Sequence, residues 1–306
     1  MKVMVFDVGG TEIKYSVMDE QMNRFDAGSV PTPQDTQEHF LDTIYALYAP
    51  HKDEVDGIAM ALPGFVDANT GYVSNGGALL YNTGTQVGQL VRERCGCRVT
   101  LENDGKAAAI AELRAGALQG CCNAAVFIIG TGVGGGIIAN GQLVRGVHFT
   151  AGEYSFVNTN AEAWDAPDQN MACQCSTKNL LKWYRARKAL PEDAPLDGRS
   201  FFAAANAGEP EALEVLRRFC HAVAVQIYNL TVLLDVEKVA IGGGISKQPL
   251  LLESLRSAYD GLYASRAGQA YMEGLPRCQI VPCAFSSEAN QVGVAAAYFE
   301  AMQKKC

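Results

Sequence analysis

The sequence lacks the features of a protein that crosses a membrane or binds nucleic acid regardless of its sequence. No apolar run reaches the 18 residues that a membrane-spanning helix needs, since even the apolar stretch Ala222–Leu234 contains Gln226 and Asn229. Positive charge is not in excess, because 25 Lys and Arg stand against 33 Asp and Glu, a net charge of −8. Non-specific binding to phosphates needs surplus Lys and Arg, so we expect no nucleic acid and no membrane as partners.

A secretion signal is also missing from the amino terminus. The apolar stretch there is short, stops at Asp7, and is not followed by a cleavage site of small residues, so we expect a cytoplasmic protein. The ten cysteines are scattered over a chain large enough to form its own core. In a reducing compartment they are predicted to be small buried thiols rather than a disulfide framework.

Length and patterning predict an α/β protein of two domains. The chain is 48% hydrophobic, which excludes disorder as the main state. Its length of 306 residues corresponds to about two domains. Short apolar runs next to glycines alternate with longer segments of helical periodicity. Residues 158–198 are polar and are predicted to be a loop-rich insertion. The predicted strands are 3–8, 13–17, 57–62, 99–101, 124–129, 137–139 and 239–241, and the predicted helices are 37–48, 87–95, 105–116 and 210–234.

Glycine-rich turns join strands in both halves of the chain. In the first, Asp7-Val8-Gly9-Gly10-Thr11, the glycines let the backbone approach a phosphate closely, and their amides can donate to its oxygens. Thr11 adds a hydroxyl donor, and Asp7 is suited to hold hydrated Mg²⁺. The alternative interpretation is a tight hairpin whose glycines only serve the turn.

The second turn, Gly130–Gly136, follows the predicted strand 124–129 and leads into another strand. A dinucleotide-binding fingerprint needs a helix after its glycines, so that interpretation is not favoured. A third cluster, Gly242–Gly244, precedes a helix. Together the three clusters predict a site that cradles a nucleoside triphosphate.

The segment Glu102-Asn103-Asp104-Gly105 lies between a strand and an Ala-rich helix. A carboxylate here can accept the proton of a hydroxyl that attacks a γ-phosphate, while Asn103 holds a neighbouring hydroxyl. The alternative is that Asn103 or Asp104 only caps the helix.

These motifs, in this order and spacing, resemble the ROK family of bacterial sugar kinases and related repressors. The resemblance covers nearly the whole chain and implies the actin-like ATPase (ribonuclease H-like) fold, with two similar domains and a cleft between them. The implied domains are 1–117, completed by a C-terminal helix at 288–306, and 118–287. The matching segments are Asp7–Thr11, Pro63-Gly64-Phe65-Val66-Asp67, Glu102-Asn103-Asp104, Gly130–Gly135, Ala151-Gly152-Glu153 and Ile241–Ser246.

The resemblance implies an ATP- and Mg²⁺-dependent kinase of a hexose or hexose derivative, with Asp104 as general base. It implies sugar binding by Gly64, Asn103, Asp104 and Glu153, and a hydrated Mg²⁺ at Asp7. It also implies a homodimer. The ATP-binding residues that it implies are Asp7, Gly9, Gly10, Thr11, Gly130, Thr131, Gly132, Gly134, Gly243 and Gly244.

Three departures from the family pattern bear on metal and substrate. Many members continue Ala-Gly-Glu with a histidine that binds zinc and sugar, but Tyr154, Ser155 and Phe156 stand here. Of the family's zinc cysteines only Cys173 and Cys175 are present, and two thiols cannot make a four-ligand site, so we predict no zinc.

The third departure is at Ala78-Leu79, where the family usually has Asn-Leu, so one sugar contact is replaced. Glucose, N-acetylmannosamine and a β-glucoside therefore stay open as substrates. A repressor of the same family would carry a helix-turn-helix before the strand that begins at Val3, so we do not expect a repressor. A non-catalytic sugar sensor is the remaining alternative, although it would have no need of Asp104.

Overall fold

The computed structural model describes residues 1–266 and 268–303, which pack as two compact units. Unit 1 contains Met1–Gly116, Leu143–Ala151 and the described residues from Ser287 onward. Unit 2 contains Ala117–Gln142 and Gly152–Ser286. Residues 143–151, which the domain boundaries above assign to the second domain, thus pack with unit 1. No helix among the described residues is long and apolar enough to span a membrane.

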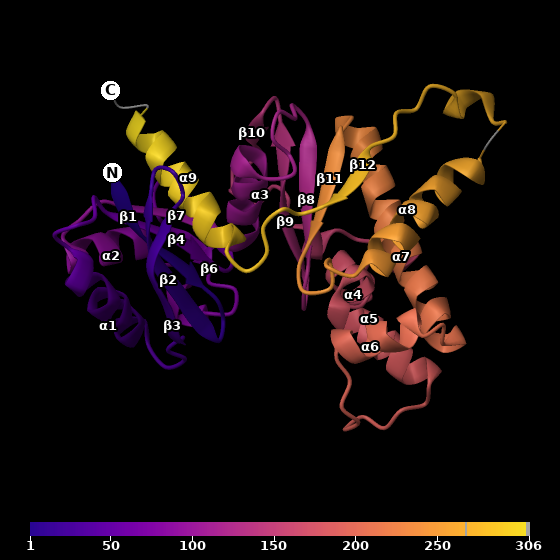
Figure 1. Cartoon of the computed structure of the whole chain (residues 1–306), viewed down its shortest axis with the longest axis horizontal. Coiled ribbons are helices and arrows are strands. Elements are labelled where there is room, and N and C mark those ends of the chain that lie inside the picture. The colour runs from indigo at the N-terminus through magenta and orange to yellow at the C-terminus, as the bar shows by residue number, and fades with distance from the viewer. Residues whose placement is uncertain (267, 304–306) are drawn as a thin grey trace. The chain divides into compact units, whose positions relative to one another are not determined.

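Unit 1 is built on a five-stranded sheet of order β3-β2-β1-β4-β7 (Figure 1). β1 pairs with β2 in an antiparallel hairpin and with β4 in parallel, and β4 pairs with β7 in parallel. The carboxyl ends of β1, β4 and β7 therefore lie at one edge of the sheet. The strands are β1 (Lys2–Val8), β2 (Glu12–Asp19), β3 (Arg24–Pro31), β4 (Ile58–Leu62) and β7 (Val99–Asn103), with a separate small sheet of β5 (Phe65–Val66) and β6 (Val73–Asn75).

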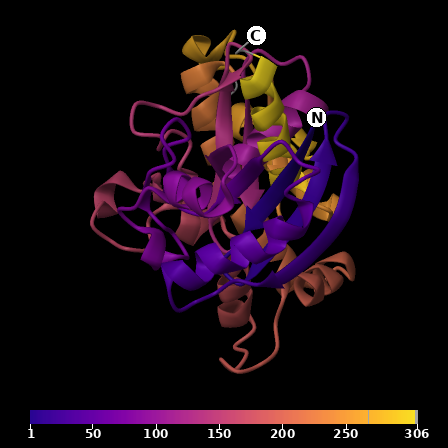
Figure 2. The ribbon, with the colours of Figure 1, turned by 90° about the vertical axis from the view of Figure 1, so that its left-hand side faces the viewer.

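Helices cover both faces of this sheet (Figure 1; Figure 2). On one face, α1 (Gln37–Tyr48) and α2 (Val87–Cys95) pack on Met4 and Phe6 of β1. On the other, α3 (Asp104–Ala115) and α9 (Ala289–Gln303) pack on each other and on β1, β4 and β7. Burial of both faces explains the nearly unbroken apolar runs of β1 and β4, which favoured strands in the sequence.

Unit 2 contains a second five-stranded sheet, of order β10-β9-β8-β11-β12. β8 and β9 form the antiparallel hairpin, and β8, β11 and β12 run parallel. Its core joins these strands to the long helix α7 and to α4, α5, α6 and α8. The elements are β8 (Ala124–Ile129), β9 (Val133–Ala139), β10 (Gln142–Leu143), α4 (Met171–Cys175), α5 (Thr177–Arg187), α6 (Gly198–Asn206), α7 (Pro210–Leu234), β11 (Lys238–Gly242), α8 (Pro249–Ala264) and β12 (Gln279–Pro282).

The two sheets repeat one strand pattern, a hairpin followed by parallel strands, which agrees with the two similar domains expected from the sequence. Two expectations were wrong in detail. The returning strand begins at Val133 rather than at Ile137, because Gly134–Gly136 pair with β8. A Cβ on Gly135 (φ +141°) would lie 1.8 Å from the Val126 carbonyl oxygen, so this glycine serves the hairpin. The segment 158–198, expected to be rich in loops, contains α4 and α5.

Helix α9 crosses α3 with no room for a side chain at the crossing point. A Cβ added to Gly293 would lie 1.8 Å from the Ala107 carbonyl oxygen, and Ala107 is in the first turn of α3. We predict that Gly293→Ala lowers the free energy of unfolding by about 2 kcal/mol or more, because two backbones must separate. Denaturant unfolding measures this.

Gly261→Ala in α8 is the matched control. Nothing lies within 4 Å of a Cβ at Gly261, so alanine should stabilise that helix by up to about 1 kcal/mol. Equal effects of the two substitutions would contradict the close packing of α9 on α3.

Candidate active site

Asp104 is positioned by the junction at which β7 ends and α3 begins. Asn103 is the N-cap: its side-chain Oδ1 accepts a hydrogen bond of 3.0 Å from the Lys106 amide. The Asn103 Nδ2 donates to Asp104 Oδ1 at 3.0 Å, and the Gly105 amide donates to the same oxygen at 2.7 Å. The carboxylate thus lies at the positive end of the α3 dipole, where negative charge is stabilised. Capping by Asn103 and a chemical role for Asp104 are therefore compatible.

The same Asn103 amide joins the turn at Gly64 to this junction. Its Nδ2 also donates to the Gly64 carbonyl oxygen at 2.9 Å. Gly64 has φ +89°, and a Cβ there would lie 2.0 Å from the Asn75 oxygen and 2.7 Å from the Gly77 nitrogen. Glycine is therefore required both by the backbone conformation and by the close approach of residues 75–77. Gly64, Asn103 and Asp104, three of the four expected sugar-binding residues, lie together.

Glu102, next to Asn103, is a buried carboxylate with a charged partner. It is 2% exposed, and its Oε2 accepts from Arg145 Nη2 at 2.7 Å and from Arg145 Nε at 2.9 Å. Its Oε1 accepts from the Asn103 amide at 3.1 Å. No motif points to Arg145, because nothing in the sequence indicates that a residue 43 positions on pairs with Glu102.

In the glycine turn after β1, the carbonyl groups accept hydrogen bonds, whereas two backbone amides donate none to the described residues. Thr32 Oγ1 donates to the Gly9 oxygen at 2.8 Å, Gln34 Nε2 to the Gly10 oxygen at 2.7 Å, and the Thr32 amide to the Thr11 oxygen at 3.0 Å. Among the described residues, the Gly10 and Thr11 amides have no hydrogen-bond acceptor. Free backbone amides in a glycine turn suit a phosphate oxygen.

This turn and the Asp104 junction share one edge of the unit 1 sheet. Asp7 is level with Ala61 on β4, and Ala61 with Glu102 on β7, so the three parallel strands end side by side. A Cβ on Gly10 would lie 2.9 Å from the Ala78 Cβ, which places the turn against the segment that contacts Gly64. Carboxyl ends of parallel strands are the usual binding edge of such sheets.

Asp7 is a buried carboxylate, 9% exposed. Burial raises its pKa above the ordinary value, and a hydrogen bond of 2.9 Å from Asn290 Nδ2 to Oδ1 acts in the opposite direction. Within the described chain, Asp7 Oδ2 accepts no hydrogen bond from another side chain. A carboxylate oxygen in this state fits a hydrated Mg²⁺, which prefers oxygen ligands and keeps several waters.

Unit 2 contains a cavity of about 620 Å³ at the ends of β8 and β11. Its wall combines apolar side chains (Leu181, Phe202 and Ile245) with three charged residues, the cationic Lys178 and Arg199 and the acidic Asp197. Apolar walls with a few charged groups suit a nucleotide, whose base is apolar and whose phosphates are anionic. Lys178 and Arg199 lie at the starts of α5 and α6. Lys178 is inside the segment 158–198 that was expected to be loop-rich and Arg199 directly follows it, so no motif in the sequence pointed to either residue.

Three of the expected ATP-binding residues of unit 2 line this cavity, namely Gly130, Thr131 and Gly244. Gly243 (φ +95°) does not; a Cβ there would lie 2.1 Å from the Ile129 oxygen, so this glycine lets β11 pass close to β8. Gly132 lies against Ser155, whose Oγ contacts both the amide and the carbonyl of Val133. Gly134 is exposed within β9.

Glu153, the fourth expected sugar-binding residue, belongs to unit 2 and directly precedes the short helix Tyr154–Phe156. Tyr154 is fully packed: its ring contacts Phe127 at 4.5 Å between centroids, and its hydroxyl donates to the Gly136 oxygen at 3.1 Å. The residues that replace the family's histidine motif therefore secure this segment to β8 and β9.

Among the described residues, Cys173 and Cys175 do not belong to any group of three or more side chains that could together bind a metal ion. Cys173 Sγ lies 3.6 Å from the Pro167 oxygen, and Cys175 is buried, which raises the pKa of its thiol to about 12. Leu180, at the position of the third family cysteine, is fully buried in the unit 2 core.

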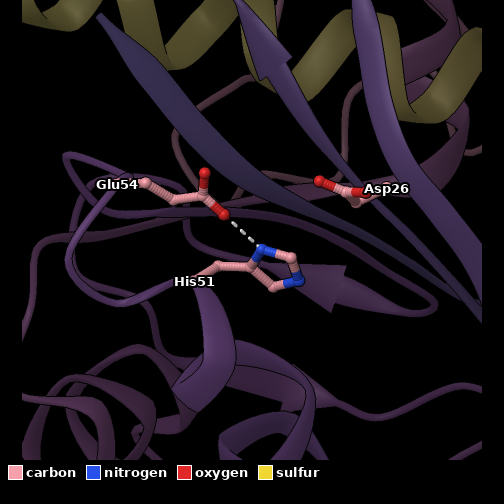
Figure 3. A group of neighbouring side chains, drawn as sticks. All are labelled: Asp26, His51 and Glu54. Atoms are coloured by element: carbon pink, nitrogen blue, oxygen red, sulfur yellow. Dashed lines mark hydrogen bonds and ion pairs between the residues drawn. The ribbon is translucent and has the colours of Figure 1, made fainter.

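One group of potential metal ligands does converge, in unit 1 (Figure 3). Asp26, His51 and Glu54 place their ligand atoms within 4.8 Å of one another, with His51 Nδ1 2.5 Å from Glu54 Oε1. His51 and Glu54 precede β4, whereas the candidate site lies where β4 ends. Asp26 and Glu54 are exposed, and we interpret the group as a surface hydrogen bond between His51 and Glu54 with a second carboxylate nearby.

The repeated sheets with a glycine turn in each first hairpin define the class: the protein has the actin-like ATPase fold. The ROK family model matches residues 3–303, and the chain belongs to the ROK family. It is 30% identical to a β-glucoside kinase of Klebsiella pneumoniae, over 84% of this chain and 86% of the relative.

Two solved structures are also similar. A ROK family protein of Streptococcus pneumoniae in complex with sucrose has a TM-score of 0.86 and 28% identity, covering 99% of this chain and 100% of the other. A ROK family glucokinase of Streptomyces griseus in complex with glucose and AMPPNP has a TM-score of 0.79 and 26% identity, covering 97% and 99%. With named kinases similar over most of its length, the protein is a carbohydrate kinase.

We predict that Arg145→Met destabilises the protein because it leaves the buried Glu102 carboxylate without its cation. The expected loss is about 2 kcal/mol, below that of a fully buried pair because the Arg145 side chain is 36% exposed. Thermal unfolding measures it, and Arg187→Met, which breaks the exposed pair with Glu214, should cost less than about 1 kcal/mol. A loss no greater than that of the control would be inconsistent with the Glu102–Arg145 pair.

The absence of zinc stays a prediction, and elemental analysis tests it. Protein purified without chelators should contain far less than one zinc per chain, because Cys173 and Cys175 lack a third described ligand. One equivalent of zinc that is lost in Cys175→Ser would overturn it.

Proposed function

We propose that the protein is an ATP-dependent kinase that phosphorylates a hexose or hexose derivative, with Asp104 as general base. The observation that carries the proposal is the β7–α3 junction, where one amide, that of Asn103, contacts both Asp104 and the Gly64 turn. A base must be held rigidly beside the hydroxyl from which it takes a proton. The similarity to a glucokinase solved with glucose and AMPPNP supports a sugar acceptor and ATP as donor.

In the proposed reaction, the Asp104 carboxylate accepts the proton of the sugar hydroxyl as its oxygen bonds to the γ-phosphorus. The bond between the γ-phosphorus and the bridging oxygen breaks, and ADP leaves. Asn103, Glu153 and the backbone at Gly64 bind sugar hydroxyls and orient the acceptor. The amides of Gly10 and Thr11 stabilise phosphate oxygens in unit 1, and Gly9 shapes their turn.

We assign the nucleotide to the cavity of unit 2, where Gly130, Thr131 and Gly244 line the wall. Gly132, Gly134 and Gly243 belong to the same glycine-rich segments, and we propose that they shape the backbone beside the nucleotide. Lys178 and Arg199 add positive charge to its wall. Asp7 would hold a hydrated Mg²⁺, which when bound offsets the negative charge of the phosphates.

The substrates that we propose are glucose, N-acetylmannosamine or a β-glucoside. The similar chains are named a β-glucoside kinase and a glucokinase. Ala78, which stands where the family usually has asparagine, lies against the glycine turn at Gly10. We further propose the domains 1–117 with 288–306 and 118–287; the two compact units follow these boundaries closely, except that residues 143–151 pack with unit 1. A homodimer and a cytoplasmic location stay predictions from the sequence.

We predict that ADP release with MgATP selects one sugar from a panel and falls at least about 10³-fold in Asp104→Asn, because the amide cannot accept the proton. The panel is glucose, mannose, fructose, N-acetylglucosamine, N-acetylmannosamine and a β-linked disaccharide. Asp19→Asn, at the end of β2 and remote from the Asp104 junction in the sequence, is the matched control and should keep full turnover.

Binding measurements separate the kinase from a non-catalytic sugar sensor. Asp104→Asn should bind AMPPNP about as tightly as the native protein, because the base contacts the acceptor rather than the nucleotide. Binding of sugar without turnover of any panel member would favour the sensor.

A further inference from the structure

Helix α9 provides a side chain that contacts the Asp7 carboxylate directly. Asn290 Nδ2 donates to Asp7 Oδ1 at 2.9 Å, across 283 positions of sequence. Asp7 is almost completely buried, so its orientation is set by this bond and by the strand, not by water. A hydrogen bond to an ionised oxygen is among the stronger ones in proteins.

Within the same turn of α9, Gly293 contacts the α3 backbone. Gly293 lies three residues after Asn290, on the same face of α9, and packs on the Ala107 carbonyl. Ala107 is three residues after Asp104. One rigid turn of α9 therefore connects the strand end that bears Asp7 with the helix that begins at Asp104.

The next residue of α9, Gln291, connects the helix to strand β2. Gln291 is 1% exposed, and its Oε1 accepts from the Ser16 hydroxyl of β2 at 3.3 Å. Charged residues near Asp7 belong to the same strand β2: Lys14, which favours the ionised carboxylate, and Glu12, which opposes it. Asn290 is thus the described side chain that holds Asp7 by a direct hydrogen bond.

We propose that Asn290 is a positioning residue for the nucleotide, which acts by fixing the Asp7 carboxylate in the orientation that receives the hydrated cation and phosphates. It directs Oδ1 toward its own amide and leaves Oδ2 for the ligand. Through Gly293, the same helix turn sets the spacing between Asp7 and Asp104. The proposal rests on the proposed function, because it assigns Asp7 to the nucleotide side of that reaction.

The test is the affinity for MgAMPPNP, measured by calorimetry without sugar. Asn290→Leu, similar in size but without the amide, should weaken binding about tenfold, the effect expected for one hydrogen bond to a charged group. Gln303→Leu, which removes an amide from the exposed end of α9, is the matched control and should bind normally. Unchanged affinity in folded Asn290→Leu would overturn the proposal.

A double-mutant cycle with Asp7→Asn distinguishes positioning from general destabilisation. If Asn290 acts through Asp7, adding Asn290→Leu to Asp7→Asn should weaken MgAMPPNP binding by less than twofold further. A full additional tenfold loss would show that Asn290 acts independently of Asp7. In turnover, KM for MgATP should rise while KM for the sugar changes less than twofold; equal rises would contradict the assignment.

A measurement on the protein without ligand keeps the inference testable if Asn290→Leu does not fold or if no nucleotide binds. The Asn290 side-chain amide resonance in the NMR spectrum of the native chain should shift on Asp7→Asn, since its acceptor loses its charge. An unshifted resonance would disprove the contact. Failure of the native protein to bind MgAMPPNP, with this shift present, would contradict the proposed function and the nucleotide role while leaving the contact established.

Discussion

The candidate site of unit 1 depends on the side chain of one asparagine, Asn103. Its oxygen caps α3, and its nitrogen donates to both Asp104 and the Gly64 carbonyl. A helix start leaves amides unsatisfied, and the residue that satisfies them has a fixed geometry. Here that geometry also determines where the Asp104 carboxylate lies, so the residue that caps the helix also positions the proposed base.

The rest of the unit 1 site follows from strand direction. Because β1, β4 and β7 are parallel neighbours, the glycine turn at Gly9 and Gly10, the Gly64 turn and the Asp104 junction all lie at one edge of the sheet. Unit 2 repeats the strand order, and its cavity lies at the corresponding strand ends. Helix α9 contacts both parts of this edge: Asn290 donates to Asp7, and Gly293 packs on the backbone of α3, the helix that begins at Asp104.

The sequence predicted those parts of the site that depend on local chemistry. The turn at Gly9 and Gly10 and the start of α3 follow from glycines and a capping residue within a few positions, and both were found. Contacts between distant segments could not be predicted this way. Nothing near Glu102 indicates Arg145, and nothing near Asp7 indicates Asn290, because each pair forms only when strands and helices pack.

The roles of individual glycines also could not be predicted from the sequence. Gly130 and Gly244 line the cavity, as expected of nucleotide-binding residues, but Gly135 and Gly243 are required where backbones nearly touch. A glycine needed for packing and one needed for a phosphate are identical in a sequence. The segment 171–187 was expected to be irregular because its composition is polar, yet it forms α4 and α5, whose apolar residues enter the unit 2 core.

A crystal structure with the preferred sugar and AMPPNP would show whether Asp104 takes the proton from the acceptor hydroxyl, as we propose. We expect the acceptor hydroxyl oxygen to lie about 2.6–3.2 Å from an Asp104 carboxylate oxygen and to face the γ-phosphorus. A complex in which that hydroxyl contacts another carboxylate, with Asp104 turned away, would contradict this proposal.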